Sequence, residues 1–505
     1  MKKRREWFIQ KNSKENLLFL GCILTIAICS FLIWRRINVF LGITGYLNVD
    51  DLCSIQFALA GDTIVSKLHL IIQNDPTNVP LFYILLSFWL RLFGFYPNTI
   101  RILPEILAGA FIVVAGLSGQ KILNRKMGIL MAVLAGSSIQ LIYAGYQIRS
   151  YSLLMLCSAL VFYVWLCKKT NRIFLFFMTG ALLLVSFSHF FGVLVCAALG
   201  SWDLICCLFK VKSKKRLLPY IGYAVLFAPY LIISYLNAKE KWGVFWPPVP
   251  GYMDFCKMLE SLCVGKNIGF VIFCITACFY LLLLANKYRS RNVNVHLDEN
   301  IMASFWVVFT VLIIGFVYSR YINPVSSVWV YRYFLVLYPF VLVILAYAVS
   351  NFGIWVKNKF LQYTIIYRAF VLAFAFLYTY RNIEYAVMHV EEINTGGSDY
   401  VAISECLITQ EDINSDDTLV YFPYPDIYFD GWIGFYTQDE KIEKPNICCT
   451  EEELRKLELT KYRTIYTVEV VYEMTEQQKA YIEETHSLMA ENYNNVEKIN
   501  KYSKK

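Results

Sequence analysis

The chain is built around repeated apolar segments, each long enough to cross a lipid bilayer. About 20 consecutive apolar residues span the hydrocarbon core as a helix. Composition agrees, because 57% of the 505 residues are apolar and only 17% are charged, against about 25% in soluble domains. A soluble globular enzyme is therefore excluded. We predict a polytopic α-helical membrane protein with eleven transmembrane helices, near 17–34, 101–120, 128–146, 150–167, 173–190, 191–209, 217–236, 267–285, 301–319, 333–350 and 361–380.

The charges divide the chain into two parts. Residues 1–382 hold 36 Lys/Arg and 13 Asp/Glu, whereas residues 383–505 hold 11 and 25. We therefore predict a basic transmembrane domain over 1–382 and an acidic, water-exposed domain over 383–505. The positive charge lies in short loops between apolar segments, where membrane orientation accounts for it, so it does not indicate a nucleic-acid partner.

The C-terminal part mixes two hydrophobic periodicities. Apolar residues alternate with polar ones at 418–424 and 464–471, whereas 451–459 and 475–492 have helical spacing. We predict a small α/β domain from this mixture.

Segment 80–95 decides the orientation. It is apolar but short, and it contains Arg91. If it does not span, the loops on the N-terminal side of the membrane hold 16 Lys/Arg and the opposite loops hold eight. If it spans, the two sides exchange and the positive-inside rule is violated. We therefore expect a surface or re-entrant helix here, a cytoplasmic N-terminus, a large first external loop over 35–98 and an extracytoplasmic C-terminal domain.

Two adjacent acids, Asp50 and Asp51, lie in this first external loop. Like-charge proximity and partial burial separate the pKa values of such a pair, so that one carboxylate can act as a general base. An ordinary solvated turn is the alternative interpretation of the dipeptide.

Further polar segments follow in order, each beside the predicted external face. Residues 74–83 read NDPTNVPLFY and lead into the short apolar segment. Residues 146–151 read YQIRSY and lie between two predicted spans. His189 stands at a later turn, and residues 331–334, YRYF, enter a late span.

Together these segments resemble the GT-C glycosyltransferases, specifically the glycosyltransferase family 39-like branch of protein O-mannosyltransferases and aminoarabinose lipid A transferases. That family has an acidic pair after the first helix, a His-Pro-Pro-Leu-Tyr-Tyr-like segment, an Arg-x-Tyr external turn and a late Arg-Tyr. The resemblance covers roughly residues 35–350. This chain departs from the pattern at Asp51, where Glu is usual, at Asn78 and Val79, which replace the His and the first Pro, and at Gln147, where Glu is frequent.

The resemblance implies an inverting, mannosyltransferase-like transfer of a sugar from a polyprenyl-phosphate carrier to a protein, lipid or cell-envelope glycan outside the plasma membrane. It assigns catalysis to Asp50, the general base, and to Asp51. Donor-phosphate or substrate binding falls to Arg149, Tyr151, Arg332, Tyr333, Asp75, Asn78 and His189. The partners are then the lipid-linked donor, the external acceptor and membrane lipids. No cofactor is expected, and a divalent metal is left open.

Several interpretations compete with these assignments. Arg35 and Arg36 are either weaker phosphate ligands or interfacial anchors. His189 can be a structural residue at a helix end. For Glu105, an intramembrane acid, we expect pairing with Arg101 at i, i+4. A lipid or polysaccharide transporter and an inactive GT-C-like scaffold remain alternatives for the whole chain.

Overall fold

The computed structural model describes residues 2–40, 49–61, 63–74, 78–94, 97–167, 170–241, 247–263, 267–290, 298–359, 376, 379–380, 406–407, 412, 415–422, 446–448, 451–469, 474–491 and 499–505. The chain forms two compact units. The first comprises Met1–Ile37, Gly61–Leu85 and Ile102–Val387, and the second comprises Asn38–Ala60, Leu86–Arg101 and Met388–Lys505. The predicted boundary at 382/383 lies outside the described residues.

The first unit is a bundle of helices. Its members are α1 (Lys2–Phe40), α3 (Ile64–Asn74), α6 (Ile102–Ile122), α7 (Arg125–Gly136), α8 (Ile139–Tyr146), α9 (Tyr151–Trp165), α10 (Arg172–Ser188), α11 (Phe191–Leu208), α12 (Leu218–Lys241), α13 (Tyr252–Leu262), α14 (Asn267–Ser290), α15 (Glu299–Val317) and α16 (Tyr338–Lys359). Short turns η2 (Lys214–Leu217), η3 (Tyr318–Ile322), η4 (Pro324–Ser326) and η5 (Tyr331–Leu337) join some of them.

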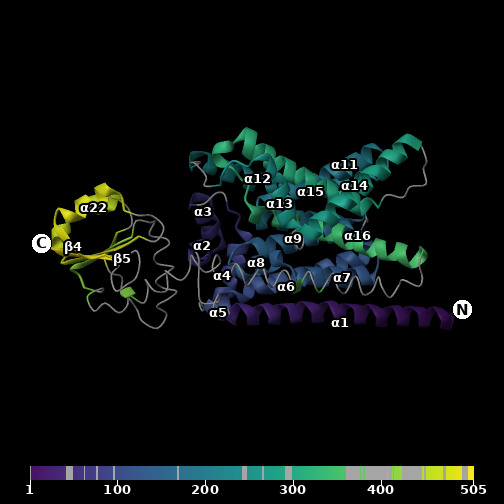
Figure 1. Cartoon of the computed structure of the whole chain (residues 1–505), viewed down its shortest axis with the longest axis horizontal. Helices are drawn as coiled ribbons and strands as arrows, with labels where there is room; N and C mark the ends of the chain where they lie inside the picture. The colour runs from purple at the N-terminus through teal and green to yellow at the C-terminus, as the bar shows by residue number, and fades with distance from the viewer. Residues whose placement is uncertain are drawn as a thin grey trace. The chain divides into compact units, whose positions relative to one another are not determined.

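Glycines allow α1, α6 and α7 to pack closely (Figure 1). A Cβ added at Gly116 would lie 3.1 Å from the Ile23 side chain and 3.3 Å from the Gly128 carbonyl oxygen. A Cβ at Gly128 would lie 2.8 Å from the Phe19 ring. Small residues at helix interfaces are typical of membrane bundles, where van der Waals contact drives association.

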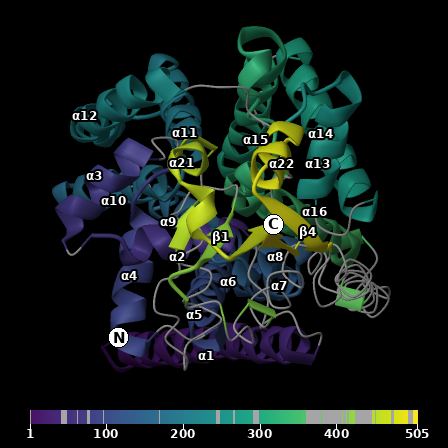
Figure 2. The same ribbon diagram turned by 90° about the vertical axis from the view of Figure 1, so that its left-hand side faces the viewer.

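Helix α9 is the central helix of this unit. It contacts α6, α8, α10, α11, α16 and η5, and it lies among its neighbours in Figure 2. The Ser158 hydroxyl donates a 2.7 Å hydrogen bond to the Val336 carbonyl oxygen, which ties α9 to η5. Helix α9 therefore helps to position η5 and the other segments that it contacts.

The predicted polytopic helical fold is confirmed. Ten of the eleven expected segments coincide with helices, and the eleventh, 361–380, lies largely outside the described residues. Within the described part of the chain, six helices are long and apolar enough to span a bilayer. The pair α7–α8, bent by 55° at Ser137–Ser138, makes a seventh if it is one broken span. The count of eleven spans stays a prediction.

Segment 80–95 contains a short helix, α4 (Leu81–Phe93). Its 13 residues extend about 20 Å as a helix, less than the ~30 Å of a bilayer core. The length agrees with a helix that does not span. The orientation of the chain, which depends on this point, stays a prediction.

A buried charge cluster joins helices at the end of the bundle away from the α10–α11 turn. Asp203 on α11 accepts hydrogen bonds from Trp165 Nε1 at 3.1 Å, Lys212 Nζ at 2.7 Å and Tyr220 at 3.1 Å. Lys212 also pairs with Glu299 at the start of α15. The charged side chains of this cluster therefore lie near the C-terminal end of α11 and the N-terminal end of α15.

The second unit contains α2 (Val49–Leu59) and α5 (Pro97–Ile100) besides C-terminal elements. The C-terminal residues form a five-stranded sheet of order β2-β1-β3-β5-β4. Strands β1 (Thr418–Tyr421), β2 (Asn446–Cys448) and β3 (Thr464–Val468) are parallel, whereas β4 (His486–Ala490) and β5 (Ile499–Lys504) pair antiparallel. Helices α21 (Glu451–Lys456) and α22 (Glu476–Glu483) accompany them.

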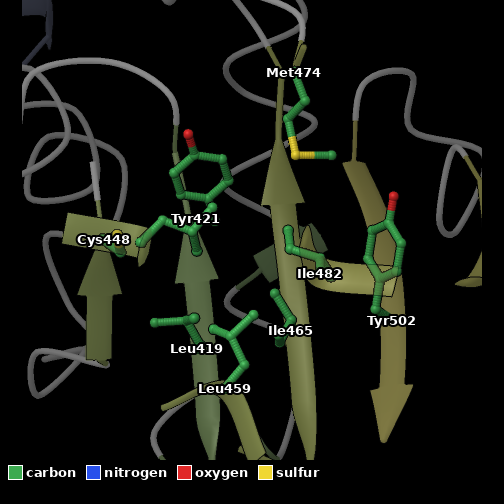
Figure 3. Packing of buried hydrophobic residues seen from close by; sticks show 9 residues of the cluster. Leu419, Tyr421, Cys448, Leu459, Ile465, Met474, Ile482 and Tyr502 are labelled. Atoms are coloured by element: carbon green, nitrogen blue, oxygen red, sulfur yellow. The ribbon is translucent and has the colours of Figure 1, made fainter. Parts of the chain in front are cut away.

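A hydrophobic cluster covers one face of this sheet, with Leu419 and Tyr421 from β1, Ile465 from β3 and Tyr502 from β5 (Figure 3). Ile482 of α22 packs against it. The predicted strands at 418–424 and 464–471 therefore exist in shortened form. The helix predicted over 475–492 is wrong beyond Glu483, because His486–Ala490 instead pairs with the last strand.

Candidate functional site

Three turns of the first unit meet at one end of the bundle. They are the α8–α9 turn, which carries Gln147 and Arg149, the α10–α11 turn, which carries His189, and η5, which carries Arg332 and Tyr333. The residues of each turn are positioned by the helices that flank it, so that their geometry depends on the packed bundle.

Arg149 lies in the α8–α9 turn, just before α9 begins at Tyr151. Its Nη1 donates a hydrogen bond of 3.5 Å to the hydroxyl of Tyr83 on α4. Tyr83 is buried. Sequence reasoning did not single out Tyr83, although it is the last residue of the 74–83 segment on which the family resemblance depends.

Arg332 and Tyr333 reach the same end from η5. The guanidinium carbon of Arg332 lies 5.9 Å from the centroid of the Tyr151 ring, within the range of a cation–π contact. The Tyr333 ring lies 4.9 Å from the imidazole of His189 and 5.5 Å from the Phe191 ring. Four of the predicted binding residues are thus in contact, in two pairs.

His189 ends α10 with an extended backbone, and its N–H donates to the Val185 carbonyl oxygen at 3.3 Å. The tight turn into α11 requires Gly192, since a Cβ there would collide with the Val185 carbonyl group. His189 Nδ1 accepts a 3.2 Å hydrogen bond from the Phe191 N–H. The proton of the neutral imidazole therefore lies on Nε2.

The positive charges of Arg149 and Arg332 both act on the imidazole of His189, so the two cations lie near the same ring. Two guanidinium groups around a neutral N–H donor are suited to bind a phosphate, which guanidinium can hold in bidentate geometry.

The acidic pair lies in the other unit, in the first turn of α2, where carboxylates interact favourably with the helix dipole. Successive helical residues face about 100° apart, so the two acids have different surroundings. Asp51 is fully buried, and its Oδ2 lies 3.4 Å from Nη2 of Arg101. Asp50 is partly exposed, and its backbone carbonyl oxygen accepts a hydrogen bond from Ser54.

Two expectations about charged pairs need revision. The predicted Arg101–Glu105 pair is replaced by other partners, since Arg101 contacts Asp51 and Glu105 contacts Arg35 at 3.3 Å. The reason is that α6 begins at Ile102, so that Arg101 lies outside the regular helix in which i and i+4 side chains align. Arg35, a weaker phosphate candidate, engages Glu105 instead.

The remaining candidates are Asn78 and Asp75. The carbonyl oxygen of Asn78, just before α4, accepts a 3.2 Å hydrogen bond from Tyr230. Asp75 lies outside the described residues. Across the described residues, no three His, Cys, Asp or Glu side chains gather as they would around a metal ion.

Comparison with known proteins gives matches of structure only. No protein-family model matches the sequence, and no curated protein does either. The fold is similar to that of ArnT from Cupriavidus metallidurans, with a TM-score of 0.57 at 10% identity, covering 98% of each chain. ArnT bound to undecaprenyl phosphate gives the same TM-score over 97% of this chain. An oligosaccharyltransferase from Archaeoglobus fulgidus aligns with 88% of this chain and 68% of its own, at 12% identity and a TM-score of 0.48.

The similarity to ArnT extends over nearly the full length of both proteins. The fold that the ordered segments indicated is therefore confirmed: the chain is a multi-pass membrane protein that shares the fold of ArnT.

Proposed function

We propose that the protein is a glycosyltransferase that moves a sugar from a polyprenyl-phosphate-linked donor to an acceptor on the extracytoplasmic side of the plasma membrane. The acceptor is a protein, a lipid or a cell-envelope glycan. In this proposal the N-terminus is cytoplasmic, and residues 383–505 form a domain on the side where transfer takes place.

The gathering of Arg149, Arg332 and His189 at three neighbouring turns is the observation that carries the proposal. A sugar leaves a polyprenyl-phosphate donor as its C–O bond to phosphate breaks, and negative charge accumulates on the departing phosphate. Preorganised guanidinium groups stabilise such charge more in the transition state than in the ground state. ArnT, which shares the fold, binds undecaprenyl phosphate, a ligand of this chemical class.

The acceptor requires a base. As its hydroxyl oxygen attacks the anomeric carbon, the proton must leave, and a positioned carboxylate can take it. We assign this role to Asp50, because it is the partly exposed member of the acidic pair. Asp51 is buried against Arg101 and serves to position α2. Attack opposite to the departing phosphate inverts the anomeric configuration.

Transfer can be measured directly. Purified full-length protein in lipid nanodiscs is incubated with undecaprenyl-phosphate-linked radiolabelled hexoses and a membrane extract that supplies acceptors. We expect label to enter the extract and free undecaprenyl phosphate to appear, with Asp50→Asn as the inactive control. Absence of transfer from every donor would contradict the proposal. Movement of the intact donor across sealed vesicles by the same protein would favour the transporter alternative.

A further inference from the structure

One buried side-chain oxygen of the α8–α9 turn has no hydrogen-bond partner in the part of the chain that the structure describes. Gln147 is 6% exposed, and its Oε1 has no hydrogen-bond partner among the residues that the structure describes. Most buried polar atoms in folded proteins have a partner, and each exception calls for an explanation. A carbonyl oxygen accepts hydrogen bonds but cannot donate them, so the missing partner is an O–H or N–H group.

Gln147 belongs to the same short turn as Arg149. The backbone at Gln147 is extended, with φ −76° and ψ 136°, and the chain then bends through residues 147–149 before α9 begins at Tyr151. Gln147 thus lies in the turn that carries the guanidinium group to which we assign the donor phosphate.

A neutral amide at position 147 affects phosphate binding by Arg149 differently from a carboxylate. A Glu would place a negative charge beside Arg149 and compete with the phosphate for it. Gln leaves the guanidinium charge available and offers an acceptor to an uncharged group. In a polyprenyl-phosphate-linked sugar, the groups next to the phosphate are the ring hydroxyls.

We infer that Gln147 is a specificity residue: its Oε1 accepts a hydrogen bond from one hydroxyl of the transferred sugar while Arg149 holds the adjacent phosphate. The substrate class is a neutral, hydroxyl-bearing hexose linked to polyprenyl phosphate. This inference rests on the proposed function, since it requires the lipid phosphate to bind near Arg149.

The test compares Gln147→Leu with the wild-type protein. Leu retains apolar bulk but cannot hydrogen-bond. Full-length protein in nanodiscs is titrated with undecaprenyl phosphate and with undecaprenyl phosphate linked to glucose, mannose or galactose. The lipid-linked hexose that binds best is then compared with versions of itself that each lack one hydroxyl. We expect this lipid-linked hexose to bind wild-type protein more tightly than undecaprenyl phosphate alone does. Removal of one particular hydroxyl should weaken binding about 3- to 10-fold, the effect of one lost hydrogen bond.

Gln147→Leu should bind undecaprenyl phosphate as the wild type does and should no longer distinguish that monodeoxy hexose from the complete one. Discrimination that persists in Gln147→Leu would overturn the inference, and so would a wild-type protein for which no hexose adds affinity. If wild-type protein fails to bind undecaprenyl phosphate itself, the proposed function fails instead.

Gln140 provides a matched control. It lies on α8, the helix that ends just before Gln147. It is 3% exposed and also has an Oε1 without a partner in the described structure, but its Nε2 donates a 2.9 Å hydrogen bond to the Ser261 carbonyl oxygen. Gln140→Leu should retain wild-type discrimination between hexose and monodeoxy hexose, even if it lowers thermal stability. Equal loss of discrimination in both variants would show a merely structural effect and would contradict the assignment.

Discussion

Asp51 and Arg101 form a fully buried ion pair, with 3.4 Å between Oδ2 and Nη2 and exposed side-chain fractions of 0% and 1%. The pair joins the first turn of α2 to the residue that precedes α6. It leaves Asp50 as the partly exposed acid of the dipeptide. A sequence with two identical neighbouring acids therefore yields one carboxylate that anchors a helix and another that, in the function we propose, acts on an acceptor.

Breaking this pair should destabilise the protein. Removal of one partner from a buried ion pair leaves an uncompensated charge and costs about 3–5 kcal/mol. We expect Asp51→Asn and Arg101→Leu each to lower the melting temperature in detergent clearly, and the double variant to cost less than the sum. Asp50→Asn should melt close to wild type. Additive effects of the two single changes would show that the pair is not coupled.

Removing either guanidinium group should weaken donor binding. A hydrogen bond to a charged group contributes about 1.5–3 kcal/mol, so Arg149→Ala and Arg332→Ala should each reduce affinity for undecaprenyl phosphate by roughly 10- to 100-fold. Lys should rescue only in part, because it lacks the planar guanidinium fork. Arg172→Ala, at an exposed position beginning α10, is the control. Normal donor affinity in both Ala variants would remove these residues from the site.

Orientation can be tested with reporter fusions. The excess of Lys/Arg on one set of loops predicts a cytoplasmic N-terminus and an extracytoplasmic C-terminus. Alkaline phosphatase, which is active only outside the cytoplasm, should be active when fused at Lys505 and silent when fused at Lys212. The reverse pattern would mean that segment 80–95 spans the membrane.

Much of the fold could be predicted from the sequence, because a span is a strong local signal. A run of apolar residues must be helical in lipid, since its backbone groups can only be satisfied internally. The helix ends then follow within a few residues, as they do for α11 and α15. Strand β4 was missed because its pairing with β5, not its own periodicity, determines its structure.

The candidate site could be predicted only as a set of residue types. The sequence indicated Arg149, Tyr151, His189, Arg332 and Tyr333, and the structure brings them together at three turns of one bundle. The partners of individual charges could not be predicted. Whether Arg101 forms an ion pair with Glu105 or with Asp51 depends on where α6 begins. The partner of Glu105 is Arg35, which is 70 residues away in the sequence.

The central claim is that Asp50 is the base of a glycosyl transfer, and the turnover of Asp50→Asn tests it most directly. Asn keeps the shape of the side chain but removes most of its basicity. With an undecaprenyl-phosphate-linked sugar as donor, we predict that Asp50→Asn folds and binds the donor as wild type does, yet loses at least ~10²-fold in turnover, the usual contribution of a general base. Asp51→Asn should lose less per folded molecule. Near-normal turnover in Asp50→Asn, with Asp51→Asn or Asp75→Asn inactive, would move the role to that residue, and normal turnover in all three variants would contradict the glycosyltransferase account.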